Sequence, residues 1–177
     1  MTVSVTPSEF KFVAYDAEVI REVAEELLES IGLGHRDLHI EVDETTPLTR
    51  MRVEIGDTIA VRAESGAFED TKKPRQQSTT TIATSLGRVL LRVADRLSGG
   101  FDEAPPDDEL TLAQLAAWET YCVGRLARLG VPVNQQRWRY NFRNRHGFTD
   151  AVDAAFDRVW AGTELSWADL EATCKSL

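Results

Sequence analysis

Apolar residues recur every three or four positions in the segment that follows Asp16. A helix has 3.6 residues per turn, so this spacing predicts an amphipathic helix with one buried stripe. Asp16 is a suitable N-cap, and Gly32 and Gly34 end the pattern. Glutamates occupy the opposite side, and the apolar stripe consists of Val19, Ile20, Val23, Ala24, Leu27, Leu28 and Ile31.

Between residues 37 and 64 the pattern becomes an alternation of apolar and polar positions, which predicts strands. Residues 37–43 form one such run, and residues 50–64 form a hairpin. A two-residue turn in the hairpin would set apolar residues opposite polar ones. A three-residue connection instead pairs Ile55 with Ile59 and Val53 with Val61. We therefore predict a three-residue connection or an equivalent bulge.

The remainder of the chain is mainly helical in pattern. Residues 65–78 are polar and are expected to form a loop, and a helix is expected from about residue 81 to 97. Thr111 and Gln114 form a capping box for the next helix. The segment 135–146 fits either a strand or a helix, and we assign it to a helix because helices flank it on both sides. Two further helices begin near Thr149 and Ser166.

These elements predict an α+β fold. A small, mostly antiparallel three-stranded sheet from residues 37–64 is expected to carry the helices 17–31 and 81–97 on one face, with a helical C-terminal half. We expect a single domain over residues 1–177. It would comprise an α+β part (1–100), an acidic, proline-containing linker (101–109) and a helical part (110–177).

The formal net charge of −9 narrows the choice of function. Nucleic-acid binders usually carry net positive charge or a long basic stripe, so the charge argues against this class. The N-terminal residues have no basic region followed by an apolar run, and no segment is apolar enough to span a bilayer. We expect a cytoplasmic protein in which both cysteines, Cys122 and Cys174, are reduced thiols.

Basic residues are concentrated in the sequence RWRYNFRNRHGF, from residue 137 to 148. Arginine beside aromatic rings can hold carboxylates, phosphates or planar ligands. Three interpretations stay open: an internal clamp to acidic residues, a pocket for a small anion or phosphorylated metabolite, or contact with an acidic protein or a nucleic acid. The candidate ligand-binding residues are Arg137, Arg139, Tyr140, Arg143, Arg145 and His146.

A second row of arginines, Arg88, Arg92 and Arg96, lies along one side of the helix 81–97. Such a row is usually the solvated side of a helix. Arg88 and Arg92 join the candidate ligand-binding residues on the hypothesis that this row faces the segment 137–145 across a groove. The two segments would then form one cationic cleft able to bind an anion.

Candidate catalytic and metal-binding residues are few. The sequence has no glycine-rich phosphate loop, G-x-S-x-G, H-E-x-x-H or C-x-x-C motif. His146 could serve as an acid or base, with Glu69 or Asp70 as a carboxylate partner. His35 and His39 could share a strand face with two acids and bind Zn²⁺ or Mn²⁺, although a solvated sheet face explains the same pattern. We predict no cofactor.

The leading hypothesis is a binding or interaction protein without catalysis that uses the segment 137–146. Its partner would be a small anionic ligand or an acidic protein surface. The alternative is an enzyme that holds an anionic or phosphorylated substrate with arginines and uses His146 as acid or base. Nucleic-acid contact is the weaker third hypothesis. The oligomeric state does not follow from the sequence.

Overall fold

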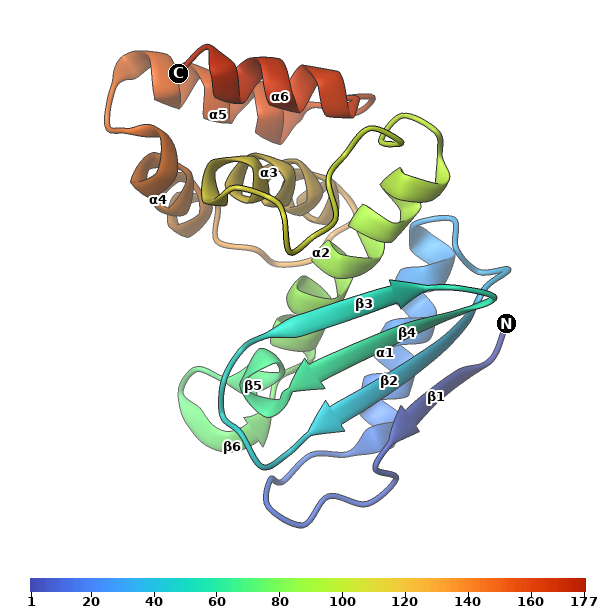
Figure 1. Ribbon diagram of the computed structural model, residues 1–177. Helices are drawn as coiled ribbons and strands as arrows, with labels where there is room; N and C mark the ends of the chain where they lie inside the picture. Colours follow the sequence, from blue (N-terminus) through green and yellow to red (C-terminus); the bar gives the residue numbers. More distant parts are fainter. The chain divides into compact units, whose positions relative to one another are not determined.

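The alternating segment 37–64 forms part of a four-stranded mixed sheet in the computed structural model, which describes all residues from 1 to 177 (Figure 1). The strand order is β1-β2-β4-β3. Strands β1, β2 and β4 run parallel, and β3 is antiparallel to β4. The strands of this sheet are β1 (Val3–Thr6), β2 (Asp37–Asp43), β3 (Met51–Ile55) and β4 (Thr58–Glu64).

The α+β class is confirmed, but the expected three-stranded, mostly antiparallel sheet is wrong. Strand β1 has only two apolar residues, Val3 and Val5, which is too short a pattern to stand out in the sequence. The chain after β2 runs to the far edge of the sheet, and the hairpin then returns β4 alongside β2. This order makes β2 and β4 parallel neighbours.

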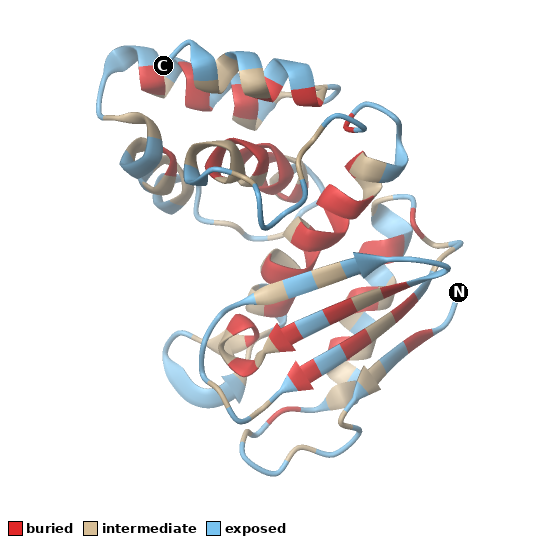
Figure 2. Cartoon of the chain, in the orientation of Figure 1, coloured by how far each residue is buried: buried red, intermediate tan, exposed pale blue.

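The predicted hairpin register is confirmed. Ile55 lies opposite Ile59, and Val53 lies opposite Val61. One face of β2 and β4 is buried, and Figure 2 shows the alternation of buried and exposed positions along both strands. The opposite face is polar, where Arg62 forms an ion pair with Glu41 at 3.1 Å.

Two helices cover the buried face of the sheet (Figure 1): α1 (Ala17–Ser30) and the first part of α2 (Thr79–Leu97). Asp16 caps α1 as predicted, accepting a hydrogen bond from the backbone N–H of Glu18 at 2.9 Å. The expected polar loop 65–78 is wrong, because this segment contains a 3₁₀ turn and a small antiparallel hairpin. Their bounds are η1 (Ser65–Ala67), β5 (Glu69–Asp70) and β6 (Lys73–Gln77).

The helical C-terminal half is also confirmed. The chain divides into two units, residues 1–90 and 91–177, with the boundary inside α2. The second unit packs around Trp118 and a cluster of Ala117, Phe142, Val152, Ala155 and Phe156. No helix combines the length and hydropathy that a bilayer span requires. The remaining helices are α3 (Leu112–Arg128), α4 (Gln135–His146), α5 (Asp150–Ala161) and α6 (Trp167–Lys175).

Candidate functional site

The arginine-rich segment 135–146 is a helix, α4, as predicted. The side chain of Asn134 accepts a hydrogen bond from the N–H of Arg137 and caps its first turn. Phe142 is fully buried, and its ring packs edge-on against the ring of Phe156 in α5. One side of α4 is therefore part of the core, and this side determines which of its arginines reach solvent.

Two of the four arginines in this segment form an internal clamp between α4 and α5. Arg143 donates two hydrogen bonds to the carboxylate of Asp153, at 2.7 and 2.6 Å. Arg139 forms ion pairs with Asp153 and Asp157, and its guanidinium lies 4.4 Å from the centre of the Phe156 ring. The bonds from Arg143, and less strongly the charge of Arg139, hold the pKa of Asp153 below its ordinary value. These contacts confirm the internal-clamp interpretation for both arginines.

His146 also makes internal contacts. Its Nε2 donates a hydrogen bond to the carbonyl oxygen of Ala113 in α3 at 3.1 Å, and its ring lies 4.2 Å from that of Phe142. Burial lowers the pKa of His146, and the hydrogen bond to Ala113 opposes this effect only in part. The hydrogen bond and the ring contact tie α4 to α3 and to the core.

Four other basic and aromatic residues of the segment 137–148 are exposed to solvent. Arg137 and Arg145 are exposed, and neither guanidinium has an ion-pair partner in the chain. Tyr140 and Phe148 are 60% and 63% exposed, and their rings meet edge-on with centroids 5.9 Å apart. We call these four residues, Arg137, Tyr140, Arg145 and Phe148, the α4 outer surface.

The arginine row on α2 is not the solvated side that its spacing indicates. Arg92 is 7% exposed and forms ion pairs with Asp107 at 3.1 Å and Glu119 at 3.7 Å. Arg96 binds the same Asp107 at 2.7 Å and the carbonyl oxygen of Pro105. Arg92 and Arg96 therefore neutralise acids and fasten the acidic segment 101–109 to α2. Arg88, the third member, is half-buried.

A further buried acid on α2 joins two residues of α3. Asp95 is 5% exposed and accepts two hydrogen bonds from Arg125, at 2.7 and 2.6 Å. It also accepts one from the indole N–H of Trp118 at 2.7 Å. Cys122 lies in the same region, and burial raises the pKa of its thiol to about 12, so it is not a thiolate nucleophile near neutral pH. Cys122 and Cys174 are both free thiols.

The histidines proposed for metal binding do not meet carboxylates in a binding cluster. His39 lies on the polar face of β2, where its two ring nitrogens are 2.9 Å from the hydroxyl of Ser4 and 3.3 Å from that of Thr6. His35 is exposed in the turn before β2. No three His, Cys, Asp or Glu side chains in the chain gather in a way that could hold a metal ion.

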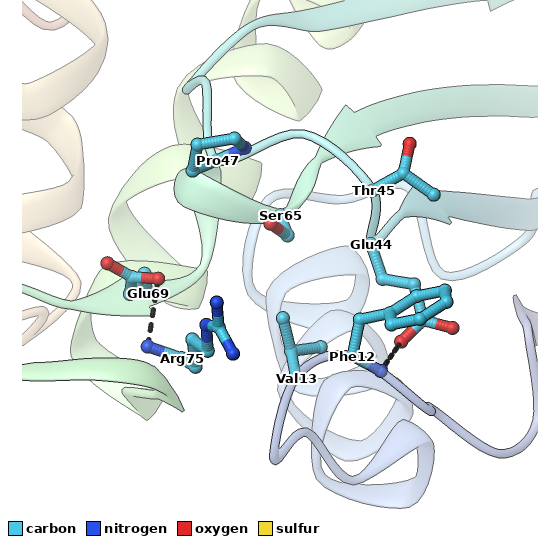
Figure 3. A pocket seen from close by; sticks show the side chains of 8 residues that line it. All are labelled: Phe12, Val13, Glu44, Thr45, Pro47, Ser65, Glu69 and Arg75. Carbon is cyan, nitrogen blue, oxygen red and sulfur yellow. Dashed lines mark hydrogen bonds between the residues drawn. The ribbon is translucent and has the colours of Figure 1, made fainter.

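The first unit contains a pocket of about 340 Å³. It lies beyond the carboxyl ends of the parallel strands, the position at which open α/β sheets bind ligands. Segments that follow β1, β2 and β4 all contribute to it, together with the hairpin β5–β6 (Figure 3). The lining residues are Phe12, Val13, Glu44, Thr45, Pro47, Ser65, Glu69 and Arg75.

Hydrogen bonds fix the walls of this pocket. One carboxylate oxygen of Glu44 accepts from the backbone N–H groups of Lys11 and Phe12, at 2.7 and 2.6 Å. The buried hydroxyl of Tyr15 donates to the carbonyl oxygen of Ser65 at 2.7 Å. Burial raises the pKa of Tyr15, and the negative charge of Glu69 adds to this effect. The loops after β1, β2 and β4 are therefore tied to one another.

Arg75 has an unusual backbone conformation in this pocket. Its φ of +61° lies in the left-handed region, which residues other than glycine seldom adopt and which costs roughly 1–2 kcal/mol. Its N–H donates to the Glu69 carboxylate at 3.0 Å, and its carbonyl oxygen accepts from Ala14 at 2.7 Å. Strained residues of this kind cluster at ligand sites.

Of the two candidate catalytic carboxylates, the structure places Glu69 in the pocket wall. Asp70 instead accepts a hydrogen bond from the N–H of Lys72 in the β5–β6 turn. Reasoning from the sequence missed Phe12, Glu44 and Arg75. These residues come together because β1 and β2 are parallel, which places the loops after both strands at the same edge of the sheet. The sequence pattern does not reveal this pairing.

Comparisons with protein-family models, with curated proteins and with solved structures found no match to this chain.

Proposed function

We propose that the protein is a non-catalytic binding protein whose α4 outer surface contacts an acidic segment of a partner protein. The observation that carries this proposal is the division of the cationic segment into two parts. Arg139 and Arg143 are bound by acids of α5, while Arg137 and Arg145 have no acidic partner. The surface therefore keeps two positive charges on a chain whose net charge is −9.

The two exposed rings support the same proposal. Tyr140 and Phe148 contact each other and yet leave most of their area to solvent. Exposed aromatic residues beside arginine have the composition of binding hot spots, in which a few such side chains supply most of the affinity. Arg137 lies one helical turn from Tyr140, so both belong to the same side of α4. A matching partner segment would combine carboxylates with an apolar or aromatic side chain.

The test is a selection of displayed random peptides on the wild-type protein, followed by affinity measurements on variants. We expect the enriched peptides to be acidic with at least one apolar anchor. Their binding should fall at least tenfold for R137E/R145E and for Y140A/F148A, and it should weaken as salt rises because exposed charges are screened.

The control is R52E/K72E, which changes the net charge equally at exposed residues of the first unit. It should bind the peptides like the wild type. Circular dichroism would verify that each variant is folded. Failure to enrich any acidic peptide, or equal binding by R137E/R145E and the wild type, would refute the proposed function.

A further inference from the structure

The pocket of the first unit offers separate groups for a positive and a negative charge. Glu44 and Arg75 come from different walls, the loop after β2 and the strand β6. Figure 3 shows the Arg75 guanidinium pointing into the space below Ser65, while Glu44 lies across the pocket beside Phe12. A ligand with a positive group at one end and a negative group at the other would complement both side chains.

The Glu44 side of the pocket suits an amine. One of its carboxylate oxygens is bound by the N–H groups of Lys11 and Phe12, and the other accepts no hydrogen bond in the chain. The ring of Phe12, 61% exposed, lies next to this carboxylate (Figure 3). An aromatic face together with a carboxylate is a favourable environment for an ammonium group, through a charge-assisted hydrogen bond and a cation–π contact.

The Arg75 side suits a carboxylate. The backbone of Arg75 is bonded at both its N–H and its carbonyl oxygen, so the residue is fixed although it is exposed. Its guanidinium makes no hydrogen bond or ion pair in the chain. Glu69, the second acidic residue of the pocket, uses one carboxylate oxygen to accept the Arg75 backbone N–H and does not form an ion pair with the guanidinium. Guanidinium groups bind carboxylates in a bidentate geometry. A group held in a strained conformation, and left without an internal partner, is available to a ligand.

We propose that this pocket binds a small zwitterion with a free amine and a free carboxylate, such as an amino acid or a dipeptide. The amine lies against Glu44 and Phe12, the carboxylate against Arg75, and the intervening apolar part against Val13 and Pro47. The volume of about 340 Å³ is within the range of small-molecule sites. This inference is independent of the α4 outer surface, which belongs to the other unit.

The test is a thermal-shift and calorimetric titration with leucine and Leu-Leu as probes. A ligand that binds only the native state raises its melting temperature. N-acetyl-leucine, which lacks the amine, and leucinamide, which lacks the carboxylate, are the matched controls for leucine, and the corresponding blocked dipeptides serve for Leu-Leu. We expect at least one zwitterion to bind and its blocked forms to bind at least tenfold more weakly. Comparison of the leucine and Leu-Leu titrations decides whether the ligand is an amino acid or a dipeptide.

Two variants separate binding from folding. R75G removes the guanidinium and places a residue that tolerates positive φ, so it should fold at least as stably as the wild type and bind at least tenfold more weakly. E44Q keeps an acceptor for Lys11 and Phe12 but loses the charge, and it should weaken zwitterion binding similarly. R52Q, on the polar sheet face, should bind like the wild type. If neither zwitterion binds, if the blocked forms bind equally well, or if R75G retains full affinity, the proposal is wrong.

Discussion

The substitution Asp95→Asn should destabilise the second unit by about 3–5 kcal/mol, the usual cost of removing one partner from a buried ion pair. The side chain of Asp95 is 6% exposed, and that of Arg125 is 19% exposed. Asparagine keeps the shape of the side chain and can still accept the Trp118 hydrogen bond. It cannot accept two bonds from Arg125, because its amide presents hydrogens where an oxygen stood.

The size of this effect follows from the burial of Arg125. After the substitution the guanidinium keeps its positive charge in a largely buried site, 4.0 Å from the centre of the Tyr121 ring. A neutral hydrogen bond contributes only about 0.5–1.5 kcal/mol, so the larger part of the loss comes from the uncompensated charge. The double variant D95N/R125M removes that charge and should be more stable than D95N alone.

Urea denaturation followed by tryptophan fluorescence measures this effect. All four tryptophans, Trp118, Trp138, Trp160 and Trp167, lie in the second unit, so their emission follows the unfolding of that unit. The matched control is E171Q, which breaks the exposed pair of Glu171 with Lys175 on α6. Exposed pairs at this helical spacing contribute only about 0.3–0.5 kcal/mol.

The reasoning is refuted if D95N lowers the free energy of unfolding by less than about 1 kcal/mol, because exposed ion pairs contribute up to about this much. It is also refuted if D95N/R125M is no more stable than D95N, because the loss would then not come from an unpaired guanidinium.

Two further predictions concern α3 and its neighbours. The pKa of His146 in the folded protein is lowered from 6.5, so around this pH the unfolded chain binds more protons than the folded protein. The free energy of unfolding should therefore decrease as the pH drops from 7.5 to 5. Urea titrations should show a smaller decrease for H146Q. An equal fall in both proteins would contradict this. Gly124→Ala should lower the free energy of unfolding by about 1–3 kcal/mol and reduce the urea midpoint accordingly, because a Cβ there would overlap the backbone of Trp160. The control G100A, where a Cβ meets only ordinary contacts, should stay near the wild-type midpoint.

Local patterns in the sequence determined most of the secondary structure. The predicted caps at Asp16 and Thr111 are both observed, because each depends on a hydrogen bond within the first helical turn. The helices expected to begin near Thr149 and Ser166 are observed as well. The hairpin register followed for a similar reason. A shift of one residue would turn every apolar side chain to the polar face, so alternation alone selects the pairing.

Tertiary structure decided the sheet topology and the partners of the charged residues. Strands β1 and β2 pair although α1 separates them in the sequence. The periodicity within one segment carries no information about pairing with a distant segment. The spacing of Arg92 and Arg96 is that of a solvated helix face. They are covered because the segment around Asp107 and residues of α3 contact them in the fold. A charge pattern shows which residues need a partner, whereas the fold determines which partner they meet.

The same distinction applies to the two candidate sites. The sequence by itself located the cationic segment 137–148, because its composition is local. It could not show that Arg139 and Arg143 bind α5 while Arg137 and Arg145 stay free, since that depends on which side of α4 faces the core. The pocket around Glu44 and Arg75 is formed entirely by tertiary structure, because parallel strands bring their carboxyl-terminal loops together from distant parts of the chain.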